Sequence, residues 1–303
     1  MAQVLISGAS GFLGSVLRPA LDAAGHQVRR LVRRPPEAPE EVQWQPQAGV
    51  LPPEAMEGVS VVINLSGAGV GDRRWTRKRQ HELIASRIAP TTVLARAVAA
   101  TGRPEVALIN ASAVGYYSDR GERHITTADG PGSSFLAQLC AAWEAAADPA
   151  REAGHRVVHL RTGIVLHPAG GALAQMLLPL RLGIAGPIAG GQQWWPWITR
   201  ADWVRAVVHL VDSSVSGPVH LSAPHPRRNA DVMSALASAL RRPAVLPIPL
   251  FAVRAIAGQF AGELAISQYL TPDKLRADGF TFSWPELQPA ADHLLQPPTP
   301  MMA

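Results

Sequence analysis

The segment Val4-Leu5-Ile6-Ser7-Gly8-Ala9-Ser10-Gly11-Phe12-Leu13-Gly14 decides how this chain folds. It opens with an apolar run typical of a buried strand, and three glycines at a GxxGxxG spacing follow directly. Between the first strand and helix of an α/β protein, such glycines let the backbone turn tightly, approach a pyrophosphate and pack helix against strand. The phosphates then meet free N–H groups at the positive helix end. The motif predicts a dinucleotide site that contains Gly8, Ser10, Gly11, Phe12 and Leu13.

Strand-like and helix-like segments alternate outward from this turn. The expected strands are 4–7, 27–32, 59–65, 106–111 and 156–165, and the expected helices are 11–24, 73–100 with a break near Pro90, and 133–151. Strands that alternate with helices pair in parallel through right-handed crossovers. The pattern therefore predicts an α/β fold with a doubly wound parallel sheet, a Rossmann fold.

The character of the chain changes after Leu166, where proline, glycine and tryptophan become frequent. A shorter pattern follows, with a helix at 201–211, a strand at 219–221 and helices at 229–240 and 251–269. We therefore expect a Rossmann domain over residues 1–166, with its core completed by about 197–222. Residues 167–303 would form mainly a smaller substrate-binding lobe and a short C-terminal domain, and the tail 296–303 has a composition that predicts fraying.

The end of the second expected strand bears on the choice of dinucleotide. Sites selective for NAD place an acidic residue about 20 positions after the glycines, where it binds the ribose 2′-hydroxyl. Here Arg33 stands 19 positions after Gly14, and Arg34 follows it. A guanidinium can bind the 2′-phosphate of NADP through two parallel hydrogen bonds. The sequence therefore favours NADP, with a solvated strand end as the alternative role of the two arginines.

Composition excludes several classes of protein. The apolar fraction of 47% and the charged fraction of 17% indicate a compact chain with a large core, not a disordered one. The single cysteine, Cys140, rules out an intrachain disulfide. No secretory signal and no uninterrupted apolar run of about 20 residues is visible. We expect a cytoplasmic protein that does not insert into membranes.

The net charge of +5 raises the question of nucleic-acid binding. Of the 28 basic residues all but Lys78 and Lys274 are arginines, and they are dispersed along the chain. We therefore predict no nucleic-acid partner. His155 and His159 are four positions apart but lie in an expected strand and lack the glutamate of a helical metal site. No metal site is expected.

Several longer motifs resemble the extended short-chain dehydrogenase/reductases, the NAD(P)-dependent epimerase/dehydratase group. The segments that carry the resemblance are the glycine turn, Asn64–Gly67, Ala111–Tyr117, Leu160–Leu166 and Trp197–Asp202. The resemblance implies that Leu65, Ser66 and Gly67 pass beneath the adenine-side ribose, and that Ser112 stands where the group has its catalytic serine or threonine.

A narrower set of motifs resembles the subgroup called epimerase family protein, which has a short C-terminal domain. Its marks are Arg74-Trp75, Ser86-Arg87, Gly115-Tyr116-Tyr117, Trp143-Glu144, Gly186-Pro187-Ile188, Gln193–Ile198 and Gly279–Phe282. By this resemblance, Glu82 and Arg87 would also lie near the cofactor.

The chain departs from the larger group in its catalytic pair. Short-chain dehydrogenases use Tyr-x-x-x-Lys, in which the lysine lowers the pKa of the tyrosine for proton transfer. The residues four positions after Tyr116, Tyr117 and Tyr269 are Arg120, Gly121 and Asp273, so the pair is absent.

Three alternatives follow from the missing pair. Tyr116 or Tyr117 acts with Ser112 as proton donor; another group or the substrate supplies the proton; or the fold binds NADP(H) as a non-catalytic sensor. The first two describe an NADP(H)-dependent oxidoreductase or epimerase-like enzyme. Trp194, Trp195 and Trp197 would either wall a pocket for a small, largely apolar substrate or pack the two lobes together. We expect a monomer or a homodimer.

Overall fold

The computed structural model describes residues 1–244 and 246–296, so most of the tail expected to fray lies outside the described residues. A seven-stranded sheet forms its centre, with every neighbouring pair parallel and the order β3-β2-β1-β4-β5-β7-β11. The strands are β1 Gln3–Ser7, β2 Gln27–Val32, β3 Glu41–Gln43, β4 Val61–Asn64, β5 Ala107–Ala113, β7 Val157–Thr162 and β11 Gly217–Leu221. The predicted doubly wound fold is confirmed.

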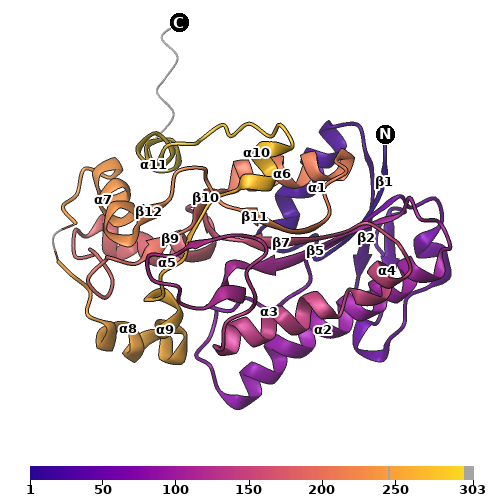
Figure 1. Cartoon of the computed structure of the whole chain (residues 1–303), viewed down its shortest axis with the longest axis horizontal. Helices are drawn as coiled ribbons and strands as arrows, with labels where there is room; N and C mark the ends of the chain where they lie inside the picture. Colours follow the sequence, from indigo (N-terminus) through magenta and orange to yellow (C-terminus); the bar gives the residue numbers. More distant parts are fainter. Residues whose placement is uncertain (245, 297–303) are drawn as a thin grey trace, which may run out of the picture.

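Helices cover both faces of this sheet (Figure 1). Because successive side chains of a strand point to opposite faces, β1 contributes to two cores. Val4 and Ile6 pack in the core beneath α1 and α6, whereas Leu5 packs in the core beneath α2 and α4. These helices are α1 Gly14–Ala23, α2 Arg77–Ala100, α4 Asp148–Glu152 and α6 Arg200–Asp212, and α3 Phe135–Ala145 contacts α2 and β5. Burial on both faces explains why the central strands β1 and β4 read as nearly continuous apolar runs.

The helix α2 continues through Pro90, so the predicted break is wrong. It begins after Thr76, whose Oγ1 accepts a hydrogen bond from the Arg79 N–H at 3.2 Å. An internal proline costs about 3 kcal/mol, and burial of residues such as Leu83 and Leu94 against the sheet offsets that cost. α2 is the one helix among the described residues with the length and hydropathy of a membrane span, which core helices also show.

Three other expected elements are divided in the structure. The segment 133–151 forms α3 and α4, with Pro149 in the first turn of α4. The segment 156–165 breaks at Gly163, where a Cβ would lie 2.0 Å from the Pro196 carbonyl oxygen, and the chain leaves the sheet as β8 Ile164–Leu166. The segment 251–269 breaks at Gly258, which has a φ of +62°. The sequence pattern did not predict β3 or α5 (Gly171–Arg181).

The second lobe lies beside the sheet and is built from short elements (Figure 1). They are β9 Trp194–Trp195, β10 Trp197–Thr199, β12 Arg227–Arg228, α7 Asn229–Ala239, α8 Leu250–Ala257, α9 Ala261–Leu264 and α11 Leu287–Leu295. The remaining elements are β6 His124–Ile125, β13 Tyr269–Leu270 and α10 Asp273–Ala277. Trp195 and Trp197 are buried in the core of this lobe, which favours the packing alternative for these two side chains. Trp194 is half-buried, and its Nε1 donates to Glu122.

Candidate functional site

The glycine turn connects β1 to α1, and its glycines have different structural roles. Gly8 has a φ of +75°, and a Cβ there would lie 2.7 Å from the Leu65 carbonyl carbon. A Cβ on Gly14 would lie 2.2 Å from the Gly8 oxygen. A Cβ on Gly11 would meet that oxygen at 3.3 Å and nothing closer. The fold therefore requires glycine at 8 and 14, whereas Gly11 keeps an open space beside the turn.

The amino end of α1 is open to an anion. No side chain of the described residues caps the helix, and no acidic residue stands in its first turn. Within the described residues, the N–H groups of Phe12 and Leu13 donate to no protein oxygen. Ser10 and Gly11 are exposed beside them. Free N–H groups at the positive end of a helix are a phosphate-binding arrangement.

A buried network of hydrogen bonds joins the end of β1, where the glycine turn begins, to the neighbouring strands. Asn64, at the end of β4, accepts a hydrogen bond from Ser7 at 2.7 Å and donates to Asn110 at 2.7 Å and to Thr91 at 2.8 Å. Ser66 Oγ donates to Ser7 Oγ at 3.0 Å. The carboxyl ends of the three central strands are thereby fixed at the point where a doubly wound sheet binds ligands.

Arg87 and Glu82 lie on α2 in different environments. Arg87 is 8% exposed and donates to the carbonyl groups of Ala68 and Leu83, and its guanidinium lies against Gly67. Burial lowers the pKa of Arg87 to about 10. Glu82 is exposed and pairs with Arg79 at 2.8 Å. Of the two, only Arg87 reaches the segment that follows β4.

The two arginines at the end of β2 are not equivalent. Arg34 binds Glu41 of β3 through two hydrogen bonds of 2.8 and 2.9 Å, and these lower the pKa of Glu41 to about 2. Arg33 is exposed and makes no ion pair within the described part of the chain. Arg33 is therefore free to contact a ligand, whereas Arg34 is held by the sheet.

Ser112 is joined to a buried ion pair. Its Oγ donates to Glu144 Oε1 at 2.6 Å, and Arg161 binds both oxygens of that carboxylate at 2.9 and 2.8 Å. Ser112, Glu144 and Arg161 are 4%, 9% and 3% exposed. Burial alone would raise the pKa of Glu144, but the hydrogen bonds from Arg161 hold the pKa below its ordinary value. The carboxylate is thus ionised and fixed.

The two candidate tyrosines lie in the short 3₁₀ helix Val114–Tyr117 after β5, and they have different surroundings. Tyr117 is fully buried, and its hydroxyl accepts from Arg161 at 2.6 Å and donates to His220 Nε2 at 2.6 Å. His220 Nδ1 faces the Thr271 carbonyl and so carries the ring proton. Burial raises the pKa of Tyr117 to about 12. Its hydroxyl is fully used within the protein.

Tyr116 differs from its neighbour because it is only half-buried. Its hydroxyl bonds to no other described residue, and the Arg161 guanidinium lies 3.6 Å from its ring centroid. Of the three candidate hydroxyl groups, those of Tyr116 and Ser112 therefore accept no hydrogen bond from a described residue, whereas that of Tyr117 accepts one from Arg161.

Sequence reasoning missed the roles of Glu144, Arg161 and His220. Glu144 stands within a motif of the subgroup and Arg161 within a motif of the larger group, but the spacing gave no indication that they pair. They are separated by 17 positions and meet because α3 packs on β5 beside β7. No group of three metal-ligating side chains occurs among the described residues.

The parallel doubly wound sheet and its glycine turn define an NAD(P)-binding Rossmann protein of the short-chain dehydrogenase/reductase class. Residues 4–222 match the sequence profile of the "NAD dependent epimerase/dehydratase family", and residues 248–294 match a domain of unknown function, DUF1731. The chain belongs to the NAD dependent epimerase/dehydratase family. The predicted resemblance, with its short C-terminal domain, is confirmed.

Relatives of similar length carry the name of the predicted subgroup. The chain is 44% identical over 283 residues to Epimerase family protein Mb2239 of Mycobacterium bovis, and the alignment covers 93% of each chain. It is 34% identical over 299 residues to human Epimerase family protein SDR39U1, and that alignment covers 97% of this chain and 99% of the relative.

Solved structures agree with this assignment. The crystal structure of human SDR39U1 (isoform 2) with NADPH has a TM-score of 0.86 and 32% identity, and the match covers 97% of this chain and 99% of that one. A nucleoside-diphosphate sugar epimerase from Corynebacterium glutamicum has a TM-score of 0.78 and 32% identity over 97% of this chain and 58% of that one.

Proposed function

We propose that this protein is an NADP(H)-dependent oxidoreductase or epimerase-like enzyme that transfers hydride between nicotinamide C4 and a small, largely apolar carbonyl or alcohol. The observation that carries the proposal is the hydroxyl of Ser112, next to the carboxyl end of β5, where ligands of doubly wound sheets bind. Ser112 donates its one proton to Glu144, so its oxygen can accept a hydrogen bond from a substrate hydroxyl. The half-buried Tyr116 is the proton donor in this scheme.

Activity in the side-chain variants tests this scheme. With NADPH and a panel of apolar carbonyls, Ser112→Ala and Tyr116→Phe are each expected to lower kcat by about 10²-fold or more, with little change in NADPH affinity. Nicotinamide absorbance follows turnover, and calorimetry follows cofactor binding. Tyr269→Phe is a matched control, because Tyr269 packs against His124 and Trp194 instead. Full turnover by both variants would exclude these hydroxyls from the chemistry.

A second candidate function is a non-catalytic NADP(H) sensor. The absence of Tyr-x-x-x-Lys favours it, and so does the Tyr117 hydroxyl, which is committed to Arg161 and His220. Tight NADPH binding with no turnover across the panel, even after prolonged incubation, would support the sensor over the enzyme.

The cofactor in this proposal is NADP(H), supported by the free guanidinium of Arg33 and by the NADPH in the related human structure. The other proposed contacts are Gly8, Ser10, Gly11, Phe12, Leu13, Leu65, Ser66, Gly67 and Arg87. We further propose a cytoplasmic monomer or homodimer that binds neither nucleic acid nor membrane. Arg34 and Glu82 contribute little, because each already has an ionic partner.

Arg33→Asp is expected to reverse the preference between the two dinucleotides. Charge-assisted hydrogen bonds are worth about 1.5–3 kcal/mol, which corresponds to roughly a 10- to 150-fold preference of the wild type for NADP. An aspartate repels the 2′-phosphate and can accept from the free 2′-hydroxyl of NAD. Titration of both dinucleotides measures the ratio. Arg34→Ala is the control and should change it less; tighter NAD than NADP binding by the wild type would refute the assignment.

A further inference from the structure

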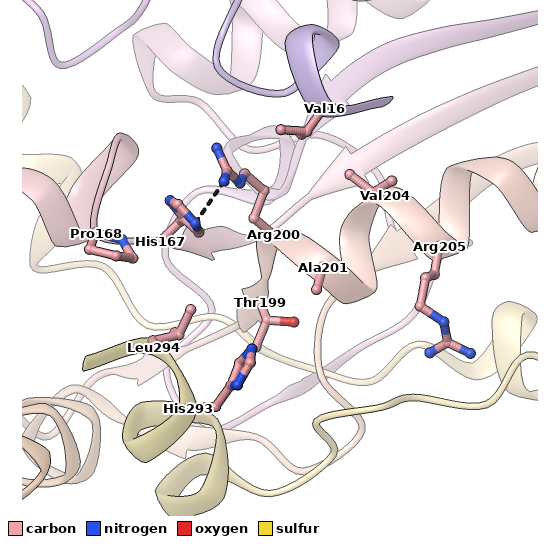
Figure 2. A pocket seen from close by; sticks show the side chains of 10 residues that line it. All are labelled: Val16, His167, Pro168, Thr199, Arg200, Ala201, Val204, Arg205, His293 and Leu294. Atoms are coloured by element: carbon pink, nitrogen blue, oxygen red, sulfur yellow. Dashed lines mark hydrogen bonds between the residues drawn. The ribbon is translucent and has the colours of Figure 1, made fainter. Parts of the chain in front are cut away.

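A pocket of about 430 Å³ is lined by residues of α1, α6 and α11 and by the segment after β8 (Figure 2). Residues from four separate segments line it. They are Val16, His167, Pro168, Thr199, Arg200, Ala201, Val204, Arg205, His293 and Leu294. This volume lies within the range of about 300–1,000 Å³ that is usual for small-molecule sites. The pocket includes none of the residues assigned above to the dinucleotide or to catalysis.

The lining of this pocket combines basic groups with apolar side chains. Arg200, Arg205, His167 and His293 line it, and no carboxylate does. The nearest acid in sequence, Asp202, is buried and accepts hydrogen bonds from Arg205 and from the backbone N–H groups of the 283–284 segment. The charge of that carboxylate is therefore already compensated, and the pocket carries an excess of positive charge.

Arg200 has no anionic partner among the described residues. Its guanidinium lies over the Phe12 ring, 5.3 Å from the centroid, and Nη2 lies 2.7 Å from His167 Nε2 (Figure 2). Burial lowers the pKa of Arg200, and no carboxylate of the described residues counteracts this effect. Burial and the neighbouring Arg200 also lower the pKa of His167, so its ring is neutral at pH 7.

The His167 ring faces hydrogen-bond donors on both sides. The Ala169 N–H points to Nδ1 at 3.1 Å, and Arg200 points to Nε2 at 2.7 Å. A neutral imidazole has one acceptor nitrogen, so it can satisfy only one of these two donors. The cluster of His167, Arg200 and Ala169 thus lacks one acceptor, and a bound anion would supply it.

We propose that this pocket binds a small organic anion, with a carboxylate or phosphate group held by Arg200 beside His167. The body of the ligand lies against the apolar side chains of Val16, Val204 and Leu294. Phe12 belongs to the glycine turn and lies against Arg200, so the site is next to the dinucleotide site but has its own charged group. The site does not depend on the proposed enzyme activity.

Calorimetric titration of the full chain tests the proposal with three probes at constant ionic strength: butyl phosphate, butyrate and inorganic phosphate. We expect saturable 1:1 binding of at least one organic probe, tighter than that of inorganic phosphate. Arg200→Gln should weaken that binding by about 10-fold or more, because a guanidinium–anion contact is lost. Arg200→Lys keeps the charge but not the two parallel donors and should give an intermediate affinity.

Two controls assign the binding to this pocket. Arg96 is exposed on α2, so Arg96→Gln removes an equal charge elsewhere and should leave the affinity unchanged. Gly11→Val blocks the glycine turn and should also leave it unchanged. Absence of saturable binding, equal affinities in the Arg200 variants and the wild type, or loss of binding in Gly11→Val alone would each overturn the proposal.

Discussion

Replacing Gly11 with valine is expected to abolish dinucleotide binding while the protein still folds. In the described part of the chain, the Gly8 oxygen at 3.3 Å is the one non-adjacent heavy atom within 4 Å of a Cβ at this position, so the added side chain extends into the open space beside the turn. There it would exclude the pyrophosphate from the free N–H groups of Phe12 and Leu13. Loss of two charge-assisted hydrogen bonds, about 1.5–3 kcal/mol each, corresponds to roughly 10²–10⁴-fold weaker binding. Calorimetry with NADPH measures the loss.

Two other glycines serve as controls for this effect. Gly130 is exposed, and a Cβ there would have no non-adjacent described residue within 4 Å, so Gly130→Val should leave both stability and NADPH affinity unchanged. Gly14→Val should lower the melting temperature as well, because its Cβ would lie 2.2 Å from the Gly8 oxygen. Unchanged NADPH affinity in Gly11→Val would show that this turn is not the phosphate site.

Removal of the Arg161 guanidinium is expected to cost about 3–5 kcal/mol in the free energy of unfolding. Arg161→Met leaves the Glu144 carboxylate buried with Ser112 as its remaining side-chain donor, and it also removes the hydrogen bond to Tyr117. Urea denaturation followed by circular dichroism measures the loss. The double variant Arg161→Met/Glu144→Leu should lose less, since no uncompensated buried charge remains.

A surface ion pair provides the comparison for this prediction. Arg151 and Asp148 are 3.0 Å apart on α4, with side chains 60% and 40% exposed. Exposed pairs contribute about 0–1 kcal/mol, so Arg151→Met should change the free energy of unfolding little. If Arg161→Met lowered the free energy of unfolding no more than Arg151→Met, burial of the Glu144–Arg161 pair would not increase its contribution to stability.

Local signals in the sequence determined the sheet and the glycine turn. A strand buried on both faces reads as a continuous apolar run, as β4 Val61–Asn64 does. The strand β2 Gln27–Val32 is less buried, and it has the predicted bounds. The break within the segment 156–165 could not be predicted from the sequence. Gly163 ends β7 because the backbone of Pro196, 33 positions later, approaches it closely. No local propensity encodes that contact.

The same distinction between local sequence signals and long-range contacts applies to the candidate site. The sequence by itself determined the dinucleotide-binding glycines, the missing Tyr-x-x-x-Lys pair and an arginine at the end of β2, because each is a pattern within a short segment. Only the tertiary structure decided that Glu41 of β3 binds Arg34 through two hydrogen bonds, whereas Arg33 has no ionic partner among the described residues. It likewise decided that Glu144 and Arg161 hold Ser112 and that the Tyr117 hydroxyl is committed. These roles depend on burial and on partners brought together by packing of separate strands and helices, and sequence spacing does not specify them.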